Sequence, residues 1–599
     1  MRMPIFEAIS AAISDFFKKQ GVAEPEIVLE QPVFAVHGDI SSNACLRYAR
    51  ELGKNPLEIA NELAGYLREQ KKIASAVTEI RVVAPGYVNF SFTLDFFAGV
   101  VKEIIKSKNF GANKNLAGQK WVVEHTSPNP NKAMHLGHLR NNLVGTSLVN
   151  LLEWNGATVK TDVIMNDRGI AIAKMMYGFL ISMQKNSETP GVDGVSVEKW
   201  IDNPENWHSP ESLGVLPDIF VTECYLAGEK AFRESSDTEQ KVRDLVVRWE
   251  SHDKKVWTLW KHVLSFSYAG IERTLARLGN REFDKIWYES EHYEEGKQWV
   301  EKGLAAGIFK KLEDGAVVSD LSAYNLADTI LLKNDGTSLY ITQDLALTAL
   351  KKKTYKADKL VWVVGPEQAL AFKQLFAVCE QLGIGKREDF THVPYGYVGL
   401  KDGEGNFQKM SSREGTVVLI DDVIDAAREK ISAIAEDLPA ETAEKLALAA
   451  VKFSILKSDR NQEISFDVKQ SVEINGDSGV YVLYTYARLK SLLRKAGNAA
   501  AKSATNSAEN IFQNEKAKDI ARLVSFFPNI VARSFDIMSA HHVAQSMLAV
   551  CGAFNAWYAN DTILDGSENQ SAKLALVAAV AAVLENGLAI LGVETVEEI

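Results

Sequence analysis

The sequence feature that most constrains the fold is a short apolar run that leads through a turn into a helical pattern. Residues 121–123 (WVV) form the apolar run, which is typical of a buried parallel strand. The helical pattern that follows is marked by four leucines, Leu139, Leu143, Leu148 and Leu151. A strand, a turn and a helix N-terminus together make a phosphate site, because the first N–H groups of the helix have no partner within it.

The turn and the start of the helix, residues 124–142, read EHTSPNPNKAMHLGHLRNN. His135 and His138 are three residues apart, so we predict that both imidazoles lie on one face of the first helical turn. Gly137 between them lacks the side chain that would block a flat ligand. The pattern therefore predicts nucleotide chemistry at this helix N-terminus.

Further strands are predicted at residues 158–165, 360–364 and 392–398, with helical patterns between them. This alternation predicts a multidomain α/β chain whose catalytic domain is a Rossmann-type, doubly wound parallel sheet. Residues from about 185 to 330 interrupt the alternation and are predicted to be an insertion, with a hairpin near its end at residues 311–320.

At 599 residues the chain is too long for a single hydrophobic core. We predict a small α+β domain over residues 1–112, with strands at 79–83 and 87–92. The α/β catalytic domain is predicted over residues 113–425, and an α-helical bundle over residues 426–599.

Composition narrows the class of protein. The net charge of −11, from 67 Lys and Arg against 78 Asp and Glu, argues against indiscriminate coating of nucleic acid. Four widely spaced cysteines without a CxxC pattern indicate neither a zinc module nor a disulfide framework, and they favour the cytoplasm. The apolar segment 574–591 contains Glu585, so we expect a packed helix in a bundle and no association with membranes.

A second chemical stretch, residues 409–416, reads KMSSREGT. A lysine, two hydroxyls and an arginine within five residues suit a loop that closes over phosphates, because charge-assisted hydrogen bonds to phosphoryl oxygens are strong. Taken alone, however, such a stretch is better explained as a solvated charged turn.

A third stretch, residues 335–344, reads DGTSLYITQD. We expect a turn at Asp335-Gly336, a strand end at residues 339–342, and one cavity faced by Tyr340 and Asp344 if a helix starts near Thr342. Asp344 could equally be a helix-start carboxylate that interacts with the helix dipole.

The sequence GPEQ at residues 365–368 follows the predicted strand 360–364 directly. In doubly wound sheets, ligands bind in the loops at the carboxyl ends of parallel strands. This position favours a functional role over a plain turn.

Together these stretches resemble class I aminoacyl-tRNA synthetases, and among them the arginyl-tRNA synthetase family. HLGH at residues 135–138 is similar to the HIGH signature, and KMSSR at residues 409–413 to the KMSKS signature. Blocks elsewhere extend the resemblance over nearly the whole chain. GDISSNACLRYAR and APGYVNF, at residues 38–50 and 84–90, resemble the family's amino-terminal domain, which contacts the tRNA elbow.

The resemblance implies an arginine–tRNA ligase. Arginine would react with ATP, bound as its Mg²⁺ complex, to give arginyl-adenylate and pyrophosphate, and the arginyl group would pass to the 2′ hydroxyl of the terminal ribose of tRNA(Arg). The implied partners are L-arginine, ATP and tRNA(Arg). The family also implies a monomer with no tightly bound metal.

The family motifs also imply roles for individual residues of this sequence. Those implied to bind arginine are Glu124, Asn129, His138, Tyr340, Asp344 and Gln368. Those implied to bind ATP are His135, Gly137, His138, Lys409, Met410, Ser411 and Ser412. Those implied to act in catalysis are His135, His138, Lys132, Lys409 and Arg413. A planar guanidinium needs a matched pair of acceptors, which Asp344 can supply.

One departure from the family pattern concerns the KMSKS signature. Its second lysine is replaced here by Ser412, and Arg413 follows. Lys132 lies just before the HLGH segment, residues 135–138. In some arginyl enzymes a lysine at this position compensates for the missing lysine of the KMSKS signature. We hypothesise that Lys132 supplies the missing charge.

The predicted C-terminal bundle resembles an anticodon-binding domain. Tyr484 and Arg488 are the residues we would place near tRNA, because aromatic and arginine side chains stack on unpaired bases. Phe554 and Trp557 are spaced as a helix requires, and a place in the core is the better interpretation for them.

Two alternatives stay open. A class I synthetase for another amino acid, glutamate or lysine, is disfavoured because a glutamate pocket should present basic groups and not Asp344. A catalytically weak paralogue that only binds tRNA is disfavoured by His135, His138 and Lys409, but Ser412 keeps it in consideration.

Overall fold

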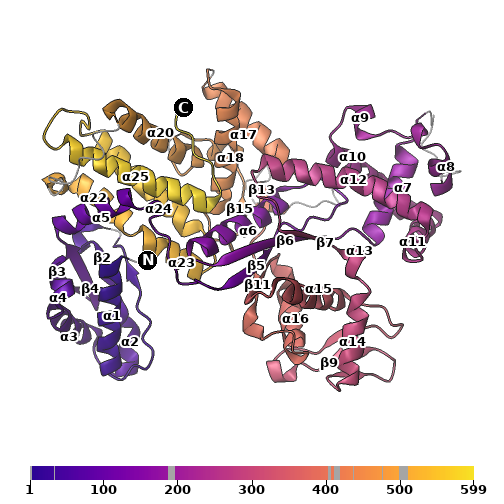
Figure 1. Ribbon diagram of the computed structural model, residues 1–599, viewed down its shortest axis with the longest axis horizontal. Coiled ribbons are helices and arrows are strands. Elements are labelled where there is room, and N and C mark those ends of the chain that lie inside the picture. Colours follow the sequence, from indigo (N-terminus) through magenta and orange to yellow (C-terminus); the bar gives the residue numbers. More distant parts are fainter. Residues whose placement is uncertain are drawn as a thin grey trace.

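The centre of the molecule is a five-stranded, wholly parallel sheet in the order β12-β11-β5-β6-β7 (Figure 1). The computed structural model describes residues 3–32, 34–185, 196–401, 407–409, 418–435, 437–474, 476–497 and 510–599. The strands of the central sheet are β5 (Lys120–Glu124), β6 (Thr158–Met165), β7 (Lys285–Tyr288), β11 (Lys359–Val363) and β12 (Phe390–Val393). The predicted Rossmann-type fold is confirmed.

Helices cover both faces of this sheet. Val123 packs with Val144 on one face, and its neighbour Val122 packs with Leu345 and Phe376 on the other. Because successive side chains of a strand point to opposite faces, a strand covered on both sides reads as a continuous apolar run. The covering helices are α6 (Leu136–Trp154), α15 (Tyr340–Tyr355) and α16 (Ala369–Gln381).

Two predictions about the sheet were wrong. The strand predicted at 392–398 is divided, because β12 ends at Val393 and Pro394 lacks the N–H that a ladder needs. Val398 begins a separate three-stranded sheet of β13 (Val398–Lys401), β14 (Phe407–Lys409) and β15 (Ile464–Ser465). Strand β7 lies inside the range predicted as an insertion and pairs with β6.

A helical lobe, residues 170–277, lies between β6 and β7 and has a hydrophobic cluster of its own. Its helices α7 and α10 cross closely at Gly178 and Gly228. A Cβ on Gly178 would lie 1.7 Å from the carbonyl oxygen of Cys224, so only glycine fits there. The helices are α7 (Ile170–Ser182), α8 (Val197–Asp202), α9 (Pro210–Leu213), α10 (Pro217–Glu234), α11 (Ser236–Glu250) and α12 (Lys254–Arg277).

The chain between β7 and α15 adds a small antiparallel sheet, which lies below the helical lobe in Figure 1. The hairpin predicted at residues 311–320 is present, with Gly315 at a φ of 96° in its turn. The elements are α13 (Glu289–His292), α14 (Glu295–Ala305), β8 (Phe309–Lys311), β9 (Val317–Ser319) and β10 (Thr329–Leu332).

The N-terminal region combines helices with a four-stranded antiparallel sheet in the order β1-β2-β4-β3. Residues 44–68 form two helices, because Gly53 ends the first in a left-handed conformation and Asn55 caps the second. The elements are α1 (Pro4–Lys19), β1 (Leu29–Glu30), β2 (Ile40–Ser42), α2 (Ala44–Leu52), α3 (Pro56–Arg68), α4 (Lys71–Ala74), β3 (Val77–Val83), β4 (Tyr87–Phe92) and α5 (Leu94–Lys106).

The predicted C-terminal helical bundle is confirmed (orange to yellow in Figure 1). By length and composition α25 could span a membrane, but 78% of its most apolar window is buried within the protein. The helices are α17 (Ile420–Ile434), α18 (Ala440–Leu456), α19 (Val468–Ser471), α20 (Gly479–Ala496), α22 (Glu515–Ser525), α23 (Phe527–Asp536), α24 (His541–Tyr558) and α25 (Gln570–Leu591).

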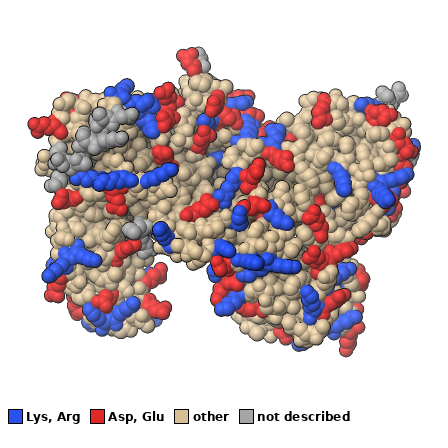
Figure 2. Space-filling view, in the orientation of Figure 1, with Lys and Arg blue, Asp and Glu red and all other residues tan. Residues whose placement is uncertain are grey.

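The charges on the molecular surface are mixed. On the face shown in Figure 2, Lys and Arg side chains are interspersed with Asp and Glu over every region. This mixture agrees with the net charge of −11. A face of this kind would contact a polyanion locally and would not attract it through a broad basic field.

Candidate functional site

A large cavity opens at the carboxyl ends of β5, β6 and β11. Glu124 ends β5, and the segment 365–368 follows β11. The strand order changes direction between β5 and β11, which is where a doubly wound sheet leaves a crevice for ligands. Predicted site residues that line the cavity are Glu124, Asn129, His135, Gly137, His138, Tyr340, Asp344 and Gln368.

One end of the cavity, which we name the imidazole end, is formed by His135 and His138. His135 is the N-cap of α6, and the two rings stack with their centroids 3.9 Å apart. The His135 N–H donates to Nδ1 of His138 and the Gly137 N–H donates to Nδ1 of His135, both at 3.2 Å. Since each Nδ1 accepts a hydrogen bond, each neutral ring carries its proton on Nε2 and can donate it to a ligand.

Both imidazoles are uncharged at neutral pH. Burial, followed by the charge of Lys132, lowers the pKa of His135 to about 4. Burial, followed by the neighbouring His135 and Lys132, holds the pKa of His138 well below its ordinary value. The imidazole end therefore offers hydrogen-bond donors to a ligand and not positive charge.

The structure gives a local reason for a glycine at position 137. A Cβ at this position would lie 3.0 Å from Cε1 and 3.1 Å from Nδ1 of His135. The missing side chain thus leaves room for the His135 ring against the helix N-terminus.

The backbone around His135 is held by the start of α17. The N–H of Leu136 donates to the carbonyl of Val418 and the N–H of Ile420 donates to the carbonyl of Met134, both at 3.1 Å. His135 and Leu419 form an isolated antiparallel bridge between these bonds. The position of α17 therefore sets the position of the imidazole end.

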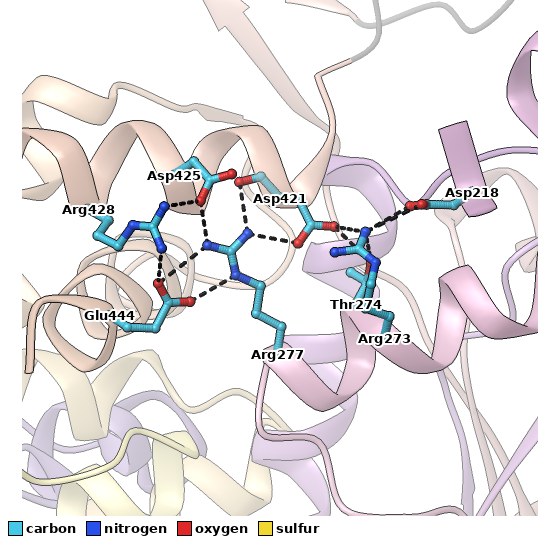
Figure 3. Close-up of polar contacts among 8 residues, drawn as sticks. All are labelled: Asp218, Arg273, Thr274, Arg277, Asp421, Asp425, Arg428 and Glu444. Carbon is cyan, nitrogen blue, oxygen red and sulfur yellow. Dashed lines mark hydrogen bonds and ion pairs between the residues drawn. The ribbon is translucent and has the colours of Figure 1, made fainter. Parts of the chain in front are cut away.

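An ion network fixes α17 against the helical lobe (Figure 3). Asp421, at the start of α17, accepts hydrogen bonds from Arg273 at 2.8 Å and from Arg277 at 2.9 Å, both on α12. Arg277 also pairs with Asp425 at 2.7 Å and with Glu444 at 2.8 Å. Several part-buried pairs that share a guanidinium hold two helices more firmly than one surface pair does.

A second part of the cavity, which we name the acidic end, is formed by the carboxylates of Glu124, Asp344 and Glu289. Burial, followed by the charges of Glu124 and Glu289, raises the pKa of Asp344 to about 7. Burial also raises the pKa of Glu124. Lys351 pairs with Glu124 at 2.6 Å and Arg168 pairs with Glu289 at 3.6 Å. The cluster can still hold a cationic group, because such a group would relieve the remaining repulsion among its carboxylates.

Comparison with known proteins identifies the family. Residues 4–92 match the arginyl tRNA synthetase N terminal domain, residues 100–195 and 207–468 match the class I (R) tRNA synthetase catalytic domain, and residues 482–599 match the DALR anticodon binding domain. An arginine–tRNA ligase of Bacteroides thetaiotaomicron is 34% identical over 572 residues, which cover 90% of each chain. The chain belongs to the arginyl-tRNA synthetase family.

Other relatives agree with this assignment. An arginine–tRNA ligase of Treponema denticola is 32% identical over 94% of this chain and 93% of its own. The solved arginyl-tRNA synthetase of Thermus thermophilus has the same fold, with a TM-score of 0.78 at 23% identity over 99% of this chain and all of its own.

The residues that the family resemblance singled out differ in their surroundings. Tyr340 opens α15, two residues before the helix start predicted near Thr342, so the strand end predicted at residues 339–342 was wrong. Its side chain is 83% exposed. Asp344, one turn further along α15, is half-buried and lines the cavity. Asn129 accepts a hydrogen bond from Asn166 at 3.1 Å. Gln368 lies in a short 3₁₀ helix that leads into α16.

The KMSSR segment, residues 409–413, lies mostly outside the described residues. The backbone of Lys409 belongs to β14 and pairs with Gly399 of β13. Met410, Ser411, Ser412 and Arg413 lie outside the described residues, so their predicted contacts with ATP stay predictions.

The residues predicted near tRNA lie on α20, in the part of the chain that matches the anticodon-binding domain of the family. Arg488 is exposed, donates to Asn555 at 2.6 Å and lies over the Tyr558 ring at 5.4 Å. Tyr484 is half-buried. Phe554 and Trp557 are buried, which confirms that they belong to the core.

Sequence reasoning missed two ionisable residues beneath the acidic end. Lys351 of α15 lies 2.6 Å from Glu124 and 2.8 Å from Asp162 of β6. Asp162 interrupts an apolar strand, which was one available signal. Lys351 lies seven residues after Asp344 and therefore on the same face of α15. It is the first of three consecutive lysines, so the sequence did not show which of the three points inward.

Proposed function

We propose that the cavity between the acidic and imidazole ends is the site where this class I arginine–tRNA ligase forms arginyl-adenylate. The observation that carries the proposal is the pairing of a buried carboxylate cluster with the N-terminus of α6 in one cavity. The first can hold a guanidinium or ammonium group, and the second can hold phosphate.

Arginine is proposed to bind with its cationic groups at the acidic end. Asp344 presents two oxygens to a planar guanidinium, and Glu124 and Asn129 hold the remaining polar groups of the substrate. Tyr340 and Gln368, at the rim, complete the pocket. His138 is proposed to contact the reacting carboxylate of arginine, which reaches the imidazole end. A site built to be neutralised by a cation rejects uncharged amino acids, because they would leave its buried carboxylates unpaired.

ATP is proposed to bind as its Mg²⁺ complex at the imidazole end. The Nε2–H groups of His135 and His138 donate to phosphate oxygens, and Gly137 keeps the backbone close. Lys409, Met410, Ser411, Ser412 and Arg413 are proposed to bind the phosphates from the other side. The metal enters with ATP as part of the substrate and is not a resident cofactor.

The reaction needs positioning and charge stabilisation more than proton transfer. A carboxylate oxygen of arginine attacks the α-phosphorus of ATP, the bond from this phosphorus to the bridging oxygen breaks, and pyrophosphate leaves with its electron pair. Neutral donors held by a helix N-terminus stabilise the charge that develops on the phosphate oxygens without needing to reorganise. The arginyl group then passes to the 2′ hydroxyl of the terminal ribose of tRNA(Arg).

Lys132 is proposed to supply the positive charge that Ser412 does not. Its charge contributes to the low pKa of both His135 and His138, which supports a place beside the imidazole end. Lys132→Ala should slow adenylate formation far more than it weakens arginine binding. A variant as active as the wild type would exclude this role.

The remaining domains are proposed to hold tRNA(Arg). The domain boundaries are placed at residues 1–112, 113–425 and 426–599, with the first domain against the tRNA elbow and the last at the anticodon, near Tyr484 and Arg488. The protein is proposed to act as a cytoplasmic monomer. Its four cysteines are all free and buried, which suits a reducing compartment.

Arginine-dependent ATP–pyrophosphate exchange, with and without tRNA, tests the proposal. We expect exchange with arginine and none with glutamate or lysine, and a requirement for tRNA would match the behaviour expected of the family. No exchange under either condition would favour a chain that only binds tRNA.

A further inference from the structure

Lys351 is a fully buried cation between two carboxylates. Its side chain is 1% exposed, and its Nζ lies 2.6 Å from Oε2 of Glu124 and 2.8 Å from Oδ1 of Asp162. The second oxygen of Asp162 accepts a hydrogen bond from Nε1 of Trp287 at 2.7 Å. A chain of short contacts thus runs from β7 through β6 and α15 to Glu124 at the end of β5.

This cation lies behind the cavity and not in it. Glu124, Asp344 and Thr348 line the cavity, whereas Lys351 does not. A buried ammonium is costly to desolvate, and a well-packed apolar side chain is often at least as stable in such a place. The arrangement is therefore better explained by what Lys351 does to its two carboxylate partners than by its contribution to stability.

The charges around Lys351 show what its removal would do. Glu124 and Asp162 would be left buried side by side without a cation, with Asp344 close to Glu124. Two carboxylates that share a buried site without a counter-charge cannot both stay ionised near neutral pH, so one of them takes up a proton. A protonated Glu124 would repel Asp344 less and would attract the cationic group of arginine less. Its carboxyl group would also be free to turn.

We propose that Lys351 is a positioning residue that keeps the Glu124 carboxylate ionised and aimed at the cationic group of arginine without touching the substrate itself. The inference rests on the proposed function, because it assigns Glu124 to arginine. It adds Lys351, Asp162 and Trp287 as a support behind the substrate-binding residues, in which Asp162 receives the second hydrogen bond of the ammonium group.

Other titratable and charged groups surround this support and contribute to its pH response. Those on the elements packed against it are Asp344, Tyr355, Cys379, Glu289, Arg168, His292, Asp284, Asp167 and Lys285. Of these, Asp344 and Glu289 are further carboxylates that line the cavity, and Arg168 pairs with Glu289 at 3.6 Å. Only a comparison of variants isolates the contribution of Lys351.

The test measures the KM for arginine and kcat in ATP–pyrophosphate exchange, with tRNA present, from pH 6.5 to pH 9. Lys351→Met should raise the KM for arginine at pH 7 by about tenfold or more, and this increase should shrink as the pH rises and the carboxylates ionise again. The KM for ATP should stay within about threefold of the wild type. Lys351→Arg should restore most of the arginine affinity because it keeps the charge.

Lys352→Met is the matched control. Lys352 is the next residue of α15 but pairs with Asp389 at 3.1 Å, away from the cavity. Its loss should leave the KM for arginine and its pH dependence unchanged. Thermal unfolding of each variant shows whether it folds.

A double variant keeps the test decisive if Lys351→Met does not fold. Lys351→Met with Asp162→Asn removes one positive and one negative charge, so the net charge around Glu124 is that of the wild type. The double variant should fold and bind arginine with a KM closer to the wild type than that of Lys351→Met. If Lys351→Met cannot be measured, the double variant should bind arginine within about tenfold of the wild type.

Two results separate failure of this inference from failure of the proposed function. An unchanged, pH-independent KM for arginine in Lys351→Met, or a loss confined to kcat, would overturn the positioning role. If Lys351→Met does not fold, an inactive double variant would do the same. A wild-type protein that shows no arginine-dependent exchange would instead overturn the proposed function.

Discussion

The two ends of the cavity bind their ligands by opposite physical means. The acidic end brings Glu124, Asp344 and Glu289 close together, and burial and the charges of the other two raise the pKa of Asp344. Lys351 and Arg168 pair with Glu124 and Glu289 and offset this repulsion only in part. The imidazole end presents two neutral rings, His135 and His138, whose donors are oriented by the backbone of α6. The carboxylates of the acidic end repel one another until a cationic group binds, whereas the donors of the imidazole end are already oriented in the free enzyme.

This difference assigns the two ends to different steps. A charge cluster that repels itself gains most from the ground-state binding of a cation, so its variants should change the KM for arginine. Fixed neutral donors gain most when charge grows on the phosphate in the transition state, so their variants should change kcat.

The largest effect is expected at Asp344. Asp344→Asn removes the negative charge that faces the guanidinium and keeps the shape of the side chain. The KM for arginine should rise about a hundredfold or more, because truncating a buried charge pair costs about 2–5 kcal/mol. Steady-state exchange at saturating ATP measures it. A KM within threefold of the wild type would remove Asp344 from the binding site.

His138→Ala should have the next largest effect, on the rate. Loss of one oriented donor to a developing charge should lower kcat by about 10²-fold, the lower end of the usual range. The KM for arginine should change much less. His138→Gln, which keeps an N–H donor, should recover part of the rate. A loss that appears only in the KM for arginine would place His138 at the acidic end instead.

The pH dependence of arginine binding should separate the ends without a mutation. Since the pKa of Asp344 is raised to about 7, this group is protonated in the free enzyme below that pH and ionised above it. The KM for arginine should therefore rise by up to about tenfold for each pH unit below 7. The steps belong jointly to Asp344 and Glu124. Asp344→Asn should flatten the profile; a profile that Asp344→Asn leaves unchanged would assign it to other groups.

The smallest effect is expected from the ion network of Figure 3. Arg277→Met removes three ion pairs, of which two fix α17 and one reaches Glu444 of α18. Helix α17 in turn holds the backbone of His135 through Leu419. We expect kcat to fall about three- to tenfold, as a slight misplacement of the donors would produce, with little change in the KM for arginine. Arg243→Met, which breaks an exposed pair in the same lobe, is the control. Equal kinetics for both variants would show that the network does not act on the imidazole end.

Much of the fold followed from the sequence because its patterns were strong. Residues 121–123 and 360–364 are continuous apolar runs, residues 158–165 are rich in β-branched residues, and the structure has strands at all three. Strand β7 was missed because it is a short edge strand, of which Lys285 and Ile286 are exposed. A strand of four residues with one covered side has too few buried positions for a periodic pattern to be recognised.

Only part of the candidate site could be predicted from the sequence, for a different reason. Segments next to strand ends could be named, and Glu124, His138 and Asp344 do line one cavity. Lys351 could not be singled out, because its role depends on Asp162 and Glu124, which lie 189 and 227 residues away in the chain. Charge balance in a buried site is a property of the assembled sheet and not of any local pattern.

The most direct test of the division between the two ends is the kcat/KM for arginine of the double variant Asp344→Asn with His138→Ala. If the ends act separately, the losses of the two single variants should multiply, with agreement in free energy to about 0.5 kcal/mol. A double variant no worse than the more damaged single variant would show that the two residues act as one unit, and would contradict this account.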